Sequence, residues 1–320
     1  MDGSRRAPST SDVALGRKLS ASYDLLKLAV GARTREPGWS EVFGDLAEYE
    51  TLLRRYTKLT LASARVFEIG FGAKPFRLVV MRSMGVDAFG IDVEVPLLRP
   101  SLSRLLQIYR RNGLERLAKT VVRAAITDRR DWKSLATELK QRGLPIRVER
   151  SRMLIGNAAE LDLPSNSIDL IVAEAVFEHV PRSSLEELVA RLADWISPGG
   201  LALVRPDIFT GISGGHLTEW FPFRVMRDES KRSEPWEHLR KRRYPPNTTL
   251  NEMMRAEYRS LFQEHFVIAE EIVKYPDLGR KYLVGDVARD LAGYTYDELF
   301  SNRVLFVLRP LPSAPLKHKL

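Results

Sequence analysis

Hydrophobic and polar residues follow two different periods along this chain. From about residue 15 to residue 61, apolar residues recur at helical spacing, as in YDLLKLAV and YETLLRRYTKLTL. Beyond residue 62, a short apolar run, RVFEIG, precedes a helical pattern, PFRLVVMRSMG, and a second apolar run, VDAFGID. Strand, helix and strand within about 30 residues predict a βαβ unit with two parallel strands.

The alternation stops at about residue 95 and resumes after about residue 150. The intervening segment is amphipathic and basic, and it predicts a helical insertion. Further strands are predicted at RMLIGNAAEL, SIDLIVAEAVF and LALVRPD, with a helix at SSLEELVARLADWI and another around TLNEMMRAEYRSLFQ. The last two strands, FVIAEEIVKY and RVLFVLRP, lack a helical crossover. We therefore predict an α/β, Rossmann-like open sheet, mostly parallel with an antiparallel C-terminal edge strand and helices on both faces.

These patterns divide the chain into three parts. Residues 1–62 form an N-terminal helical segment, whose first dozen polar residues are expected to be disordered. Residues 63–310 form the main domain, with the insertion at about 95–150 and a segment rich in Trp, Pro, Arg and His at about 207–262. Residues 311–320 form a tail.

Composition excludes several kinds of site and location. The chain has no cysteine, so disulfides, thiolate metal sites and cysteine nucleophiles are absent. No apolar run approaches the roughly 18 residues that span a bilayer, and the first residues lack the apolar core of a secretion signal. We expect a cytosolic protein. The net charge of +9 fits either a solvated surface or an anionic partner. Nucleic acid is not favoured, because no recognition module for it appears.

Polar residues and glycines follow three predicted parallel strands. Gly70 and Gly72 follow the first strand, Asp92 ends the second, and Asn157 and Ala158 follow the third. Open α/β sheets bind ligands at the carboxyl ends of their strands. A carboxylate placed like Asp92 can accept hydrogen bonds from ribose hydroxyls. A tight turn alone would also explain the glycines.

At these residues the chain resembles the class I S-adenosylmethionine-dependent methyltransferases, especially the type 11 group. FEIGFGA resembles the first motif, GIDVE the second, GNAAELDLPSNSIDLIVAEAVFEHV the third and fourth, and ISPGGLALV the turn into the fifth strand. The resemblance implies S-adenosyl-L-methionine as the cofactor. It also implies the cofactor-binding residues: Glu68, Gly70, Gly72, Asp92, Asn157, Ala158 and Glu174.

Two departures from the family pattern bear on this interpretation. Lys74 and Pro75 replace the usual last glycine of the first motif, and Asn157 stands where an aspartate is common. A dinucleotide needs that glycine for its pyrophosphate, whereas S-adenosylmethionine has no phosphate. The missing glycine therefore favours the methyl donor over a dinucleotide.

The segment after the fifth strand, RPDIFTGISGGHLTEWFPF, is expected to lie over the methyl end of the cofactor site, where the methyl acceptor binds. A hydroxyl acceptor benefits from a general base, commonly histidine, or from a metal. We assign His216 as the base and Asp207 as the second catalytic residue. No metal site is assigned, although Asp207 and His216 could bind a metal together.

Other residues leave two interpretations open. His179 and Glu178 either line the cofactor side or serve the structure. His238, Asn247 and Asn251 could line an acceptor pocket, and the asparagines could instead cap a turn and a helix. Within the insertion, Tyr109, Arg110 and Arg111 could meet the acceptor or face water.

Together these features predict O-methylation of a small-molecule or glycan hydroxyl. The alternatives are an RNA or protein methyltransferase, a non-catalytic cofactor-binding protein of the same fold, and a dinucleotide oxidoreductase. The oligomeric state does not follow from the sequence.

Overall fold

The computed structural model describes residues 38–311 except 97, 99–104, 107, 111–112, 114–116, 118–120, 122–127 and 247. The predictions for residues 1–37, for part of the insertion and for nearly all of the tail therefore lie outside the described residues. Of the predicted N-terminal segment, the described part contains one long helix, α2 (Trp39–Tyr56).

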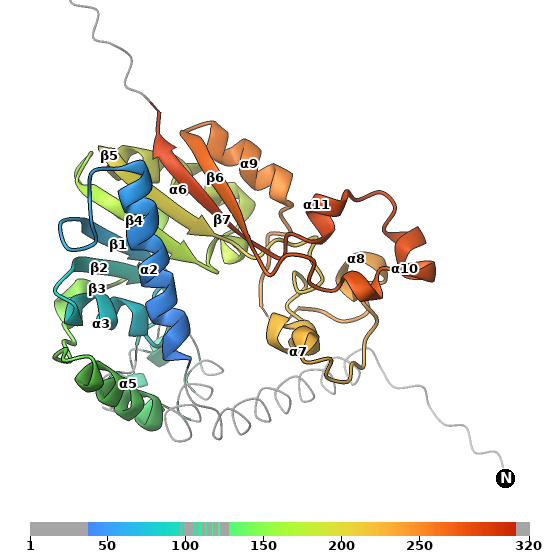
Figure 1. The fold of residues 1–320 in the computed structure, drawn as a ribbon, viewed down its shortest axis with the longest axis horizontal. Coiled ribbons are helices and arrows are strands. Elements are labelled where there is room, and N and C mark those ends of the chain that lie inside the picture. The colour runs from blue at the N-terminus through green and yellow to red at the C-terminus, as the bar shows by residue number, and fades with distance from the viewer. Residues whose placement is uncertain are drawn as a thin grey trace, which may run out of the picture.

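A seven-stranded sheet forms the centre of the molecule (Figure 1). Its strands, in sheet order, are β3 (Met153–Ile155), β2 (Asp87–Asp92), β1 (Arg65–Ile69), β4 (Ile168–Glu174), β5 (Ile196–Arg205), β7 (Arg303–Pro310) and β6 (Phe266–Lys274). The first five pair in parallel, and β7 runs antiparallel to both β5 and β6. The predicted Rossmann-like fold is confirmed, with one refinement: the antiparallel strand lies inside the sheet and β6 forms the edge.

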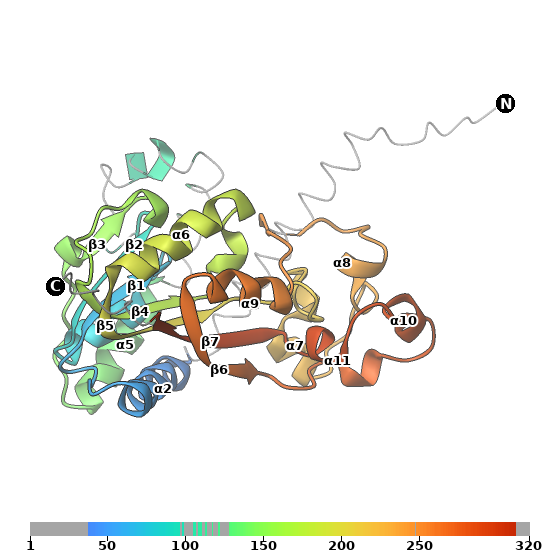
Figure 2. The same ribbon diagram turned by 90° about the horizontal axis from the view of Figure 1, so that it is seen from above.

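Helices cover both faces of the sheet (Figure 2). One face carries α2, α3 (Phe76–Ser83) and α5 (Arg129–Gln141), and the other carries α6 (Arg182–Trp195) and α9 (Arg255–Gln263). Alternating strand residues supply the two cores. Val66 and Val172 pack toward α2, whereas Phe67 and Ile171 pack toward α6. Strand alternation therefore decides which face each polar side chain reaches.

Beyond the carboxyl edge of the sheet, a small lobe has its own core (Figure 1). It contains four short helices: α7 (Pro222–Met226), α8 (Glu237–Arg240), α10 (Gly285–Asp290) and α11 (Tyr296–Leu299). The buried residues of the lobe core include Trp220, Trp236 and Phe300. The lobe thus includes most of the predicted segment 207–262, whose last residues belong to α9 on the sheet, and also residues that precede β7. None of the described helices is long and apolar enough to cross a membrane.

The helix expected around residues 249–263 is shorter than predicted. α9 begins at Arg255, because the preceding residues bind a loop instead of continuing the helix. The Asn251 backbone amide donates to Glu178 O at 2.9 Å.

Candidate functional site

The turn after β1 contains two glycines with left-handed backbone angles. Gly70 has φ 77° and Gly72 has φ 71°, which side chains disfavour. A Cβ on Gly70 would lie 2.0 Å from Val176 Cγ2, so this turn packs directly against the loop after β4. A Cβ on Gly72 would meet, among the described residues, only the Lys74 amide nitrogen at 4.0 Å. The backbone at Gly72 is therefore open to a ligand.

Asp92 connects this turn to the end of β2. Its Oδ2 accepts a hydrogen bond from the Gly72 amide at 2.6 Å, and its Oδ1 accepts one from the Glu94 amide at 2.6 Å. A carboxylate oxygen can accept two hydrogen bonds. These contacts are therefore compatible with the ribose role that the resemblance implies.

Lys74, one of the two residues that replace the last glycine of the first motif, forms ion pairs with a neighbouring helix. Its ammonium group lies 2.9 Å from Asp128 and 2.6 Å from Asp131, at the start of α5. Pro75 directly precedes the first residue of α3. The altered residues thus fasten the turn to two helices.

Asn157 and Ala158 follow β3 as predicted. Asn157 is exposed, and its Oδ1 accepts a hydrogen bond from the Ala159 amide at 3.1 Å, which caps a short turn. Ala158 and Ala159 are buried. The cofactor-binding role of Asn157 stays a prediction.

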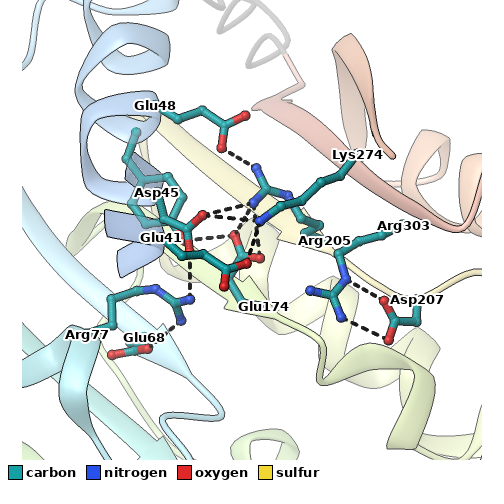
Figure 3. Close-up of polar contacts among 11 residues, drawn as sticks. Glu41, Asp45, Glu48, Glu68, Arg77, Glu174, Arg205, Asp207, Lys274 and Arg303 are labelled. Carbon is teal, nitrogen blue, oxygen red and sulfur yellow. Dashed lines mark hydrogen bonds and ion pairs between the residues drawn. The ribbon is translucent and has the colours of Figure 1, made fainter. Parts of the chain in front are cut away.

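Glu68 points to the α2 face of the sheet, where it is fully buried. Arg77 of α3 lies 3.1 Å from its Oε1 and 2.9 Å from Asp45 of α2 (Figure 3). Burial raises the pKa of Glu68, and the charge of Arg77 opposes this shift. Glu68 is therefore held by the protein itself, at the interface of β1 with α2 and α3.

Glu174, at the end of β4, is held in the same way. Tyr49 of α2 donates a hydrogen bond to it at 2.7 Å, and Arg205 of β5 lies 3.4 Å away. Arg205 is only 2% exposed, and it also contacts Asp45 at 3.4 Å and Glu48. Burial raises the pKa of Glu174, while Arg205 acts in the opposite direction.

We call this set of interacting residues the α2 network. Its members are Glu41, Asp45, Glu48, Tyr49, Glu68, Arg77, Glu174, Arg205 and Lys274 (Figure 3). Sequence reasoning missed Tyr49, Arg77 and Arg205. The sequence feature that could have indicated this network is a charged residue, Arg205, at the end of an apolar strand.

A second polar group lies where β4 and β5 end, on the side of α9. We call it the acceptor cluster; it consists of Glu178, Asp207, His216 and Arg303. His216 Nε2 lies 3.3 Å from Asp207 Oδ2, and Arg303 of β7 binds both Asp207 oxygens, at 2.5 and 3.0 Å (Figure 3). The structure thus brings together the two residues predicted to be catalytic.

The charges around Asp207 keep it ionised. Burial alone would raise the pKa of Asp207, but the charge of Arg303, the hydrogen bonds that Arg303 donates and the neighbouring His216 lower the pKa well below its usual range. An ionised Asp207 can orient the His216 imidazole and stabilise its protonated form.

Glu178 completes the acceptor cluster from the short helical turn η5 (Phe177–His179). Its side chain is 3% exposed, and neither carboxylate oxygen has a hydrogen-bond partner among the described residues. Burial raises the pKa of Glu178 well above its usual value, and Asp207 raises it further. One ligand atom each from Glu178, Asp207 and His216 lies within 4.8 Å of the other two.

Two glycines place His216 beside Asp207. A Cβ on Gly214 would lie 2.2 Å from Phe209 O, and a Cβ on Gly215 would lie 2.4 Å from His238 Cγ. His216 itself has φ 51°, a strained angle for a residue with a side chain. Such strain is common at functional sites, since the surrounding structure must impose it.

The remaining candidate residues mainly support these loops. His238 is buried, its Nε2 lies 2.8 Å from Phe209 O, and burial lowers the pKa of His238 to about 4. Asn251 donates to Phe177 O at 2.7 Å and to Val180 O at 3.0 Å, so it clamps η5 and does not cap α9. Asn247 lies outside the described residues.

His179 lies next to the acceptor cluster. Its Nδ1 is 3.0 Å from Thr249 O, and its ring meets that of His216 edge to face at 5.2 Å. Burial lowers the pKa of His179. In the insertion, Tyr109 and Arg110 are exposed, and Arg111 lies outside the described residues.

Comparison with known families gives a match to part of the chain. Residues 113–204 match the model of a family described as a methyltransferase domain. The match includes β3, β4, α6 and most of β5, and so the third and fourth motifs quoted above. The matched residues are therefore similar to methyltransferase domains, in agreement with the resemblance noted in the sequence. A search of curated proteins found no match.

Solved structures resemble this chain only distantly. The PH0226 protein from Pyrococcus horikoshii OT3 is 14% identical, with 84% of this chain and 90% of that chain covered and a TM-score of 0.41. A putative methyltransferase from Haloferax volcanii, in complex with the Trm112 activator, is 14% identical, with 89% of this chain and 96% of that chain covered and a TM-score of 0.42. Geranyl diphosphate C-methyltransferase from Streptomyces coelicolor A3(2) is 12% identical, with 83% of this chain and 76% of that chain covered and a TM-score of 0.40. Similarity at this level carries no argument about the acceptor.

The described residues fit the cofactor that the resemblance implies. Gly72 presents open backbone, Asp92 presents a carboxylate beside it, and buried Ala158 adds a small side chain at the end of the neighbouring strand. All three stand at the carboxyl edge of the sheet. Glu68 and Glu174 border this region from the α2 network.

Proposed function

We propose that this methyltransferase transfers a methyl group to a hydroxyl of a small molecule or glycan. The observation that supports the proposal most strongly is the 3.3 Å contact between His216 Nε2 and Asp207 Oδ2 at the carboxyl end of β5. An uncharged hydroxyl is a poor nucleophile, so such an acceptor needs a group that removes or weakens its proton. The acceptor cluster provides groups of this kind.

The packing of the two loops supports the same assignment. The turn after β1 that contains Gly70 and Gly72, which we call the cofactor turn, touches Val176 at Gly70. Val176 lies two residues before Glu178. A methyl donor held at that turn would therefore lie next to the loop that carries the acceptor cluster. Methyl transfer is an in-line displacement, and such placement of donor and acceptor supplies much of its rate.

We assign the residues as follows. Gly70, Gly72, Asp92, Asn157 and Ala158 would bind the S-adenosylmethionine that this family uses as methyl donor. Glu68 and Glu174 would shape the site from the α2 network. His216 and Asp207 would activate the acceptor hydroxyl, and Arg303 would hold Asp207 in its ionised form.

Two measurements test this proposal. Calorimetric titration should show micromolar binding of S-adenosylmethionine and S-adenosylhomocysteine, lost in Asp92→Ala, and no binding of NAD. Incubation with panels of sugars and alcohols, followed by detection of S-adenosylhomocysteine and a product 14 Da heavier, should find a hydroxyl acceptor. Transfer only to RNA or protein would contradict the proposed acceptor. Cofactor binding without transfer to any acceptor would favour a regulatory protein. We also retain the prediction of a cytosolic location, which cell fractionation would test.

A further inference from the structure

The buried carboxylate of Glu178 lacks the neighbours that such a group requires. It is 3% exposed, makes no ion pair with lysine or arginine among the described residues, and has no hydrogen-bond partner on either oxygen. The nearest basic atom in an ion-pair contact is His179 Nε2, at 3.9 Å. Burying a carboxylate without compensation costs several kcal/mol. A cation or a proton must therefore accompany it.

The groups beside Glu178 are metal ligands by type. Asp207 supplies carboxylate oxygen and His216 supplies ring nitrogen, with one ligand atom of each within 4.8 Å of Glu178 and of each other. Atoms bound to one ion at roughly 2.1 Å lie up to roughly 4.2 Å apart. A small movement of these side chains would therefore bring all three to an ion.

The charge around the cluster also favours a cation. Glu178 and Asp207 carry two negative charges when ionised, and Arg303 supplies one positive charge to Asp207. Arg303 leaves Glu178 without an ion pair of its own. The arrangement resembles a pair of carboxylates in which only one has been neutralised.

We infer that Glu178, Asp207 and His216 bind a divalent cation, of the first-row kind that accepts two oxygen ligands and one nitrogen ligand, such as Mn²⁺ or Zn²⁺. This inference rests on the proposed function, which it deepens. The cation would bind the acceptor hydroxyl and promote loss of its proton to water. The oxygen would then form a bond to the methyl carbon while the carbon–sulfur bond breaks, with the electron pair remaining on sulfur. His216 then acts as a ligand and not as the base expected from the sequence.

Calorimetric titration of the full, metal-depleted chain with MnCl₂, ZnCl₂ and MgCl₂ tests the inference. We expect one equivalent of Mn²⁺ or Zn²⁺ to bind. Glu178→Gln and His216→Ala should each weaken this binding at least tenfold, while Glu264→Gln, at an exposed residue of the same charge, should leave it unchanged. Melting curves of each variant establish that it is folded, and His216→Ala keeps the test decisive if Glu178→Gln does not fold.

Two results would overturn the inference. The first is that no metal binds to the native chain, or that one binds equally well to both variants. The second is full methyl transfer by metal-free Glu178→Gln, which would make Glu178 a neutral carboxylic acid, since glutamine mimics that form. Metal binding that follows the expected pattern, without transfer to any hydroxyl, would instead contradict the proposed function and leave the metal site standing.

Discussion

The α2 network and the acceptor cluster occupy the same edge of the sheet, but they differ in whether each carboxylate has a basic partner. In the α2 network each carboxylate has an arginine or lysine within 4 Å. In the acceptor cluster Asp207 has Arg303, whereas Glu178 has no such partner among the described residues. Balanced buried charge is what a fold needs for its own integrity. A buried carboxylate without a basic partner, such as Glu178, instead favours the binding of a cation.

Strand alternation separates the two groups. Glu68, Glu174 and Arg205 occupy strand positions that face α2. Glu178 and Asp207 follow the strands, in loops that turn toward α9 and the lobe. The α2 network therefore lies on the α2 face of this edge, and the acceptor cluster lies on the side of α9 and the lobe.

The largest effect should come from breaking the α2 network at Arg205. Arg205→Met would leave the buried Asp45 and Glu174, and the partly exposed Glu48, without the arginine that they share. Removing one partner of a buried ion pair costs about 3–5 kcal/mol. Urea denaturation should show that loss in the free energy of unfolding.

Arg54→Met is the matched control, because Arg54 forms an exposed pair with Glu50 one helical turn away. Such a pair contributes at most about 0.5 kcal/mol. A loss below about 1 kcal/mol in Arg205→Met would mean that the α2 network is not a stabilising unit.

Substitution in the acceptor cluster should lower activity and have little effect on stability. We expect His216→Ala to lower kcat by roughly 10²–10⁴-fold, the usual range for a group that moves or weakens a substrate proton. Cofactor affinity and Tm should stay near the native values, since His216 bonds the cluster and not the cofactor turn. Steady-state kinetics with the identified acceptor, together with calorimetry, provide the measurement.

His265→Ala, in the loop after α9, is the control and should keep native kcat. If His216→Ala kept more than a tenth of native kcat, the catalytic assignment of His216 would be wrong.

The contact between the cofactor turn and the loop before Glu178 should give an intermediate effect. Gly70→Ala combines an unfavourable φ of 77° with a clash against Val176. We expect a loss of about 1–3 kcal/mol in unfolding free energy and weaker binding of S-adenosylhomocysteine. Adding Val176→Ala should restore only the part that comes from the clash.

Gly44→Ala tests whether glycine replacement in general matters. Gly44 lies in α2 with no atom within 4 Å of an added Cβ, so alanine should be neutral or stabilising by up to about 1 kcal/mol. Equal losses at Gly44 and Gly70 would remove the case for a specific contact with Val176.

The sequence predicts the sheet and the positions of the polar edge residues, because apolar runs and the residues that follow them are local features. It does not predict where the charged side chains at that edge find partners. Tyr49 and Glu174 are 125 residues apart, Arg205 and Glu48 are 157 apart, and Arg303 and Asp207 are 96 apart. The charge balance of each group depends on these distant partners, so the sequence could not distinguish Glu174 from Glu178.

A paired carboxylate outside both groups provides the smallest and most selective test of this charge argument. Glu271 of β6 lies 2.7 Å from Arg255 and 2.6 Å from Arg259 of α9. Burial alone would raise the pKa of Glu271, but hydrogen bonds from Arg259 and Arg255 outweigh it and lower the pKa. A lowered pKa in the folded state adds stability above the unfolded value of about 4.3, and this stability is lost as the pH falls through the folded pKa. Denaturation between pH 3 and 7 should therefore show a shallower loss of stability toward low pH in Glu271→Gln than in the native chain. Parallel curves would mean that the arginines do not favour the ionised carboxylate, and that proximity of opposite charges is a poor guide to charge balance in this molecule.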